Sequence, residues 1–97
     1  MDFEWDPEKA ARNLRKHEVS FSEAATVFED PLSLTVPDPD HSEEENRYII
    51  FGRSGRGRLL MVAHAERNKR LRLISARTLT RSERTADEEE VSRRQGR

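Results

Sequence analysis

The stretch LLMVAHAERNKRLRLISARTLTRSER, residues 59–84, predicts two strands joined by a polar turn and followed by the start of a helix. Successive side chains of a strand point to opposite faces. The faces predicted for the second strand are Leu71, Leu73 and Ser75 on one side, and Arg72, Ile74 and Ala76 on the other. Such a strand can bury one face and present guanidinium groups on the other, where each group can fork onto a phosphate of RNA or DNA. A solvated strand face is the simpler interpretation of any single arginine.

The composition favours one small cytoplasmic domain. The 97 residues suit one domain, and with 33% hydrophobic and 38% charged residues the core must be thin. We therefore expect a partner chain to cover apolar surface. The lack of cysteine excludes a disulfide framework, a thiolate nucleophile and a zinc finger. The acidic start MDFEWDPEK does not fit a signal peptide, and no apolar stretch approaches a membrane span.

Charge is distributed unevenly along the chain, although the formal net charge is only -1. Residues 1–46 hold four basic and thirteen acidic residues, a net charge of -9. Residues 47–84 hold eleven basic and two acidic residues, a net charge of +9. The split indicates a basic patch that suits nucleic acid. It is also explained by two halves that neutralise each other within the fold.

Eight elements are predicted, in the order β-α-α-β-β-β-β-α. Their ranges are 3–5, 7–17, 20–29, 32–36, 47–52, 58–65, 71–78 and 80–91. The cap Asp6-Pro7 and the capping boxes Ser20-x-x-Glu23 and Thr80-x-x-Glu83 mark the helix starts. This order is typical of an α+β domain, with helices on one face of a small antiparallel sheet of four to five strands. We expect residues 1–92 to form this single domain and residues 93–97 to be a frayed tail.

An ordered set of motifs resembles the BrnT family. In chain order these are Glu4-Trp5-Asp6-x-x-Lys9, Asn13-x-x-Lys16-His17-x-Val19-Ser20-Phe21-x-Glu23-Ala24, Phe28-x-Asp30-Pro31, Asp40-His41, Arg47, Gly52, and Ile74-Ser75-Ala76-Arg77 with Glu83-Arg84. BrnT proteins are toxins of type II toxin–antitoxin pairs. The resemblance implies a RelE-like fold, ribonuclease activity that stops translation, and inhibition by a BrnA-like antitoxin. That antitoxin would carry a ribbon-helix-helix module, so the hetero-oligomer would reach operator DNA through the antitoxin and repress its own operon.

Two positions depart from the family pattern. The family usually has glycine after the Lys-His pair, where this chain has Glu18. Glycine tolerates the positive φ that often closes a helix, so we expect the helix end to be rebuilt here. The family also tends to carry a tyrosine shortly after Glu-Arg, where this chain reads Thr85-Ala86-Asp87. If that tyrosine assists catalysis, the enzyme is weakened; Tyr48, in an apolar strand, fits the core better.

Metal-independent cleavage of RNA needs a base near the ribose 2′-OH, positive charge on the phosphate and an acid for the leaving oxygen. The catalytic candidates are His17, His41, Glu45, Arg47, Arg77 and Arg84. Simpler interpretations stay open: a surface histidine at 41, a dipole-stabilised cation at 17, and ion pairs for the arginines. We expect no cofactor and no metal, because three histidines without cysteine or a close histidine pair are a poor ligand set.

Further side chains are candidates for contacting RNA without taking part in the reaction. They are Lys16, Arg53, Arg56, Arg58, Arg72 and Trp5. The arginines near the predicted turns fit contacts to the RNA backbone or a docking surface for an acidic partner. Trp5 can stack on a base or pack in the core, and His64 fits packing on the sheet.

Three functions are compatible with these patterns. The first is a toxin endoribonuclease that cleaves RNA and inhibits translation. The second is a non-enzymatic partner that binds a DNA-binding antitoxin and modulates operon repression. A stand-alone nucleic-acid binder is the third, although no recognition helix or RNA-stacking motif is present.

Overall fold

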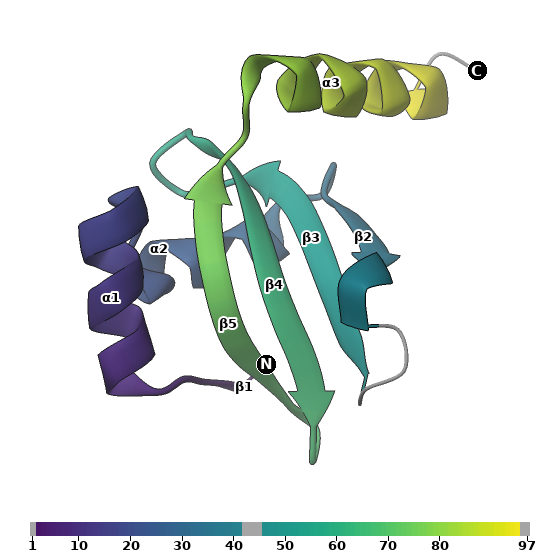
Figure 1. Cartoon of the computed structure of the whole chain (residues 1–97). Coiled ribbons are helices and arrows are strands. Elements are labelled where there is room, and N and C mark those ends of the chain that lie inside the picture. The colour runs from purple at the N-terminus through teal and green to yellow at the C-terminus, as the bar shows by residue number, and fades with distance from the viewer. Residues whose placement is uncertain (1, 42–45, 96–97) are drawn as a thin grey trace.

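One five-stranded sheet organises the computed structural model of the chain, which describes residues 2–41 and 46–95. The strands are β1 (Asp2–Glu4), β2 (Leu34–Pro37), β3 (Arg47–Arg53), β4 (Leu59–Arg67) and β5 (Arg70–Thr78). The helices are α1 (Pro7–His17), α2 (Phe21–Thr26) and α3 (Arg81–Gln95), with short 3-10 helices η1 (Val27–Glu29) and η2 (Pro39–His41). The predicted α+β class and element order are confirmed (Figure 1).

The sheet is mixed rather than purely antiparallel. Its strand order is β1-β5-β4-β3-β2, with antiparallel pairs from β2 to β5 and a parallel pair between β1 and β5. The expectation of an antiparallel sheet is therefore wrong for β1. This strand runs directly into α1, which packs on β5, so the helical connection and not a hairpin turn sets its direction.

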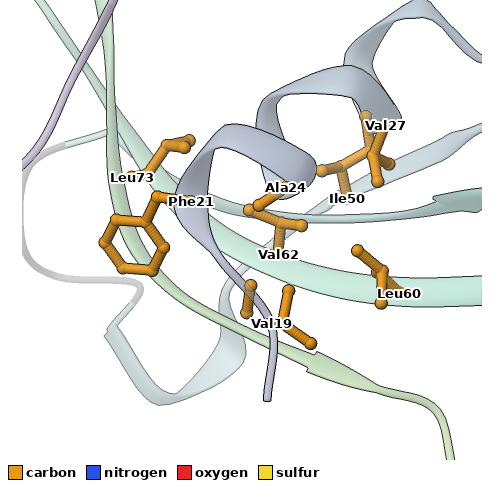
Figure 2. Close-up of a cluster of buried hydrophobic side chains, with 9 residues drawn as sticks. Val19, Phe21, Ala24, Val27, Ile50, Leu60, Val62 and Leu73 are labelled. Atoms are coloured by element: carbon orange, nitrogen blue, oxygen red, sulfur yellow. The ribbon is translucent and has the colours of Figure 1, made fainter. Parts of the chain in front are cut away.

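The core lies between α2 and one face of β3, β4 and β5 (Figure 2). Its buried members are Val19, Phe21, Ala24, Val27, Ile50, Leu60, Val62, Leu73 and Ala76. Full burial of a side chain such as Phe21 or Leu60 stabilises the fold by about 1.5–3 kcal/mol. The helix face predicted from residue spacing is confirmed, since Phe21 and Ala24 are buried and Phe28 packs against the cluster.

A β-bulge divides β5 into two halves with opposite phase. His64 of β4 pairs with Leu73 and Ala63 pairs with Ser75, so Ile74 is the extra residue. Leu73 faces the core as predicted, but beyond the bulge Ala76 is buried and Ser75 is exposed. The predicted faces of residues 75 and 76 are therefore wrong, because an inserted residue shifts the alternation by one.

The C-terminal helix α3 does not share the face that α1 and α2 cover. In Figure 1 it crosses the end of the sheet beyond β5. Its residue Ala86 lines an apolar hollow of about 280 Å³ together with Leu34, Phe51 and Met61. Phe51 and Met61 alternate with the core residues of β3 and β4, so this hollow lies on the opposite face. The expectation that all helices share one face is therefore wrong. Helix α3 also continues to Gln95, beyond its predicted end at residue 91. No helix of the described residues is long and apolar enough to cross a membrane.

Helix α1 ends at Glu18 in the left-handed conformation, with φ 58° and ψ 33°. The Glu18 N–H donates to the Leu14 carbonyl at 2.9 Å, the bond that a C-terminal glycine usually makes. The helix end is therefore not rebuilt, and the expectation that it would be is wrong. Glutamate takes up the conformation that suits glycine.

Glu18→Gly is expected to stabilise the protein by about 0.5–1 kcal/mol, because relief of left-handed strain exceeds the added chain entropy of glycine. Urea denaturation of the variant and the wild type measures the difference. Glu18→Ala is the matched control, since it removes the carboxylate and keeps the Cβ. A lower denaturation midpoint for the glycine variant would contradict the prediction.

Candidate functional site

A hollow of about 340 Å³ lies where the β3–β4 turn meets the start of α3. Its lining residues are Arg53, Gly57, Arg58, Leu59, Thr78, Leu79, Arg84 and Glu88. Three arginines and one glutamate give this lining a formal charge of +2. The structure thus brings together three arginines that the sequence nominates separately, and we call this feature the arginine hollow.

The turn that forms one wall of the arginine hollow is held by backbone bonds. Ser54 N–H donates to the Arg58 carbonyl at 2.8 Å, and Gly57 N–H donates to the Ser54 carbonyl at 2.8 Å. Gly57 has φ 85°, a conformation that side chains disfavour. Arg53, which precedes the turn, is fixed by two bonds: its Nη1 donates to the Gly57 carbonyl at 2.8 Å, and its N–H donates to Asp30 Oδ2 at 2.8 Å. The predicted turn is confirmed, and it orients Arg53.

Glu23 fixes the second arginine of the hollow. Its carboxylate, of which only 5% is exposed, accepts bonds from Arg58 Nε at 2.9 Å and from Ser54 Oγ at 2.7 Å. Arg58 holds the pKa of Glu23 below its usual value. The capping box predicted here forms only in part: Glu23 N–H donates to Ser20 Oγ at 3.0 Å, while the glutamate side chain turns to Arg58.

Several predicted RNA-contacting arginines pair with carboxylates of the acidic first half. Arg56 lies 3.7 Å from Glu23, and Arg72 lies 3.3 Å from Glu4. The interpretation that the two halves neutralise each other therefore applies to Arg56, Arg58 and Arg72. It does not extend to Arg84, whose guanidinium has no side-chain partner within the part of the chain that the structure describes.

Arg77 pairs instead within the basic half of the chain. Its Nη1 and Nη2 donate to Glu83 Oε1 and Oε2, both at 2.9 Å. Hydrogen bonds from Arg77 and from the Thr80 backbone lower the pKa of Glu83 to about 2. Glu83 therefore stays ionised near neutral pH and is a poor proton acceptor. Arg77 itself adjoins the arginine hollow through Thr78, which lines it.

The structure does not bring the predicted histidines to the arginine hollow. His17 and Lys16 end α1, which packs on the other face of the sheet. His41 lies in η2, and Glu45 lies outside the described residues. Arg47 begins β3, and roughly 20 Å of extended strand separates it from Arg53 at the other end.

Glu88 is a residue of the hollow that the sequence reasoning missed. It is the only carboxylate among the lining residues that the structure describes there. Its position four residues after Arg84 places both on one face of α3, which is the signal that could have identified it.

Aromatic candidates lie in the packed interior. Trp5 packs edge-on against Phe21, with ring centroids 5.9 Å apart. His64 is 3% exposed and lies against Phe28 and Tyr48, with centroids at 4.8 and 6.0 Å. Burial lowers the pKa of His64, so its neutral form is favoured. The predicted packing of His64 is confirmed, whereas RNA stacking by Trp5 stays a prediction. Within residues 2–41 and 46–95, no three His, Asp or Glu side chains group to hold a metal ion.

Comparison with known families gives the class of protein to which this chain belongs, a ribonuclease toxin. The sequence model of the family described as "Ribonuclease toxin, BrnT, of type II toxin-antitoxin system" matches residues 5–83. The chain belongs to the BrnT family. Membership gives it a toxin role, with RNA as the substrate and an antitoxin as the partner.

A solved structure supports the fold assignment independently. The chain is similar to the crystal structure of the Brucella abortus ribonuclease toxin BrnT, with a TM-score of 0.66 and 19% sequence identity. The match covers 84% of this chain and 99% of that one. Comparison with curated proteins gives no match. At this level of identity the similarity concerns the fold alone.

Proposed function

We propose that the chain is a metal-independent endoribonuclease that cleaves RNA at the arginine hollow and thereby inhibits translation in the cytoplasm. The observation that carries the proposal is that Arg53, Arg58 and Arg84 line one concave surface, on which the guanidinium groups of Arg53 and Arg84 have no carboxylate partner among the described residues. Guanidinium groups aimed at a phosphate stabilise the charge that develops on it during cleavage.

The reaction that this surface suits is attack of the ribose 2′-OH on the adjacent phosphorus. The 2′-oxygen loses its proton to a base, a 2′,3′-cyclic phosphate forms, and the bond from phosphorus to the 5′-oxygen breaks. The leaving oxygen takes up a proton. Glu88 is the carboxylate placed to accept the first proton, because it lines the same hollow as the arginines. Catalytic roles for His17, His41, Glu45 and Arg47, and RNA contacts by Lys16, Arg56 and Arg72, stay predictions.

A BrnA-like antitoxin with a ribbon-helix-helix module is the partner that we propose for neutralisation. The complex would bind operator DNA through the antitoxin. The thin core and the apolar hollow beside α3 leave surface that such a partner can cover.

Cleavage of a labelled single-stranded RNA by the purified protein, in the presence of EDTA, tests the enzymatic proposal. We expect products that end in 2′,3′-cyclic phosphate and no cleavage of a 2′-O-methyl RNA. Arg84→Ala is expected to slow cleavage by at least about 10-fold. Arg93→Ala is the matched control, since Arg93 lies on the same helix and pairs only locally with Glu90. RNA that stays intact, or cleavage that EDTA abolishes, would contradict the proposal.

The ion pairs of Glu4 and Glu23 favour a second function, in which the chain binds a DNA-binding antitoxin without cleaving RNA. A gel shift of operator DNA with the antitoxin, with and without this chain, separates the two. Unchanged DNA binding argues against the second function.

A further inference from the structure

Arg77 uses only part of its hydrogen-bonding capacity within the protein. A guanidinium carries five N–H groups: one on Nε and two on each Nη. Nη1 donates to Glu83 Oε1 at 2.9 Å and to the Thr78 carbonyl at 3.1 Å, and Nη2 donates to Glu83 Oε2 at 2.9 Å. The Nε–H and the second Nη2–H have no partner among the described residues, and they share one edge of the guanidinium plane.

The carboxylate that holds Arg77 is itself fixed. Glu83 Oε1 accepts from the Thr80 N–H at 2.8 Å, and the Glu83 N–H donates to Thr80 Oγ1 at 3.2 Å. This reciprocal pair is the capping box predicted for the start of α3. The Glu83 carboxylate is therefore fixed by the Thr80 backbone and in turn binds Arg77. The orientation of the guanidinium plane follows from the start of the helix.

The unused edge of Arg77 is accessible and has the right geometry for one ligand. The side chain of Arg77 is 34% exposed, so it is not sealed from solvent. Two parallel N–H groups on one edge match two oxygens of a phosphate, which is the bidentate arrangement that arginine favours. Thr78, whose carbonyl accepts from Arg77 Nη1, lines the arginine hollow, whereas Glu83 lines the apolar hollow.

We infer that Glu83 is a positioning residue. It holds Nη1 and Nη2 of Arg77, so that the Nε–Nη2 edge of the guanidinium binds one phosphate of the RNA substrate. The inference rests on the proposed ribonuclease function and adds a role for Glu83 in it. Arg77 is the residue that touches RNA, and Glu83 acts through Arg77. The opposite arrangement, in which Glu83 occupies the place of the phosphate and must leave, predicts the opposite effect of removing the carboxylate.

A double-mutant cycle on RNA cleavage tests the inference. The proteins are the wild type, Glu83→Gln, Arg77→Ala and the double variant. Glutamine keeps the shape of glutamate but replaces one acceptor by a donor that faces Nη2. We expect Glu83→Gln to lower kcat about 10-fold with KM within about 2-fold, because the phosphate fork matters most in the transition state. In the Arg77→Ala background the same change should alter the rate by less than about 2-fold.

Thr80→Ala is the control for the helix start, because it removes the cap hydroxyl but keeps the backbone N–H that holds Glu83 Oε1. It is expected to lower thermal stability and to leave kcat within about 2-fold. Equal effects of Glu83→Gln in both backgrounds would show a merely structural role and overturn the inference, as would a rise in cleavage. An unaffected Glu83→Gln variant of an active wild type overturns the inference alone. A wild type that cleaves no RNA overturns the proposed function, and the inference falls with it.

Discussion

Arg77→Ala is expected to lower the rate of RNA cleavage by about 10²–10³-fold while leaving the protein folded. The expected loss is large because the guanidinium is held rigidly before RNA arrives. Two bonds of 2.9 Å to Glu83 and one of 3.1 Å to the Thr78 carbonyl fix its plane. A donor fixed in this way stabilises developing charge without reorganisation during the reaction. Initial rates on labelled RNA at saturating substrate measure the loss.

The matched control for this variant is Arg72→Ala. Arg72 lies on the same strand, has a side chain 33% exposed, and also pairs with a glutamate, through one bond of 3.3 Å to Glu4. If Arg72 contacts RNA, it contacts a single phosphate of the RNA backbone. We therefore expect its loss to change cleavage by no more than about 3-fold and to reduce the salt dependence of RNA binding slightly. Equal losses for the two variants would show that cleavage does not depend on the position beside the arginine hollow. Thermal denaturation of both variants verifies that they fold.

The largest expected effect on stability comes from Asn13→Ala, which we expect to destabilise the fold by about 3 kcal/mol. Asn13 is buried on α1, and its Nδ2 donates to the carbonyls of Val19 at 2.9 Å and Ala76 at 2.8 Å. Its Oδ1 accepts from the Ala76 N–H at 3.0 Å. Alanine would leave these three backbone groups buried without partners, and each unpaired group costs about 1–3 kcal/mol before relaxation.

Urea denaturation measures this loss, and for a domain of this size it corresponds to a fall in Tm of roughly 12–24 °C. Arg12→Ala is the control, because Arg12 precedes Asn13 on the same helix and is exposed. We expect it to change stability by no more than about 0.5 kcal/mol. A loss below about 1 kcal/mol for Asn13→Ala would mean that water or a rearranged loop satisfies the freed groups.

Local sequence signals predicted those parts of the fold that depend on contacts between residues close together in the sequence. The caps at Asp6 and Thr80 and the spacing of Phe21 and Ala24 identified the helices, because these signals act within one or two turns. The turn that ends in Gly57 is local in the same sense. The bulge at Ile74 was not predictable in this way, since it depends on the pairing of β5 with β4.

The candidate site was only partly predictable for a similar reason. Arg77 and Arg84 were predicted as phosphate ligands, but their environment depends on contacts that residue spacing does not encode. Glu23 reads as a helix cap, yet its carboxylate binds Arg58, 35 residues away. The neighbours of Arg84 in the hollow come from a turn far earlier in the chain, which only the folded sheet brings close.

The parallel pairing of β1 with β5 has a consequence for the cell that makes this protein. Asp2 pairs with Arg70, so β1 cannot form its strand pairing until β5 has been synthesised, late in translation. Contacts between such distant residues also slow folding. A nascent or prematurely terminated chain that stops before β5 lacks Arg77, Arg84 and an edge for its own first strand. The order of synthesis thus delays assembly of the proposed RNA-binding surface until the polypeptide is nearly complete.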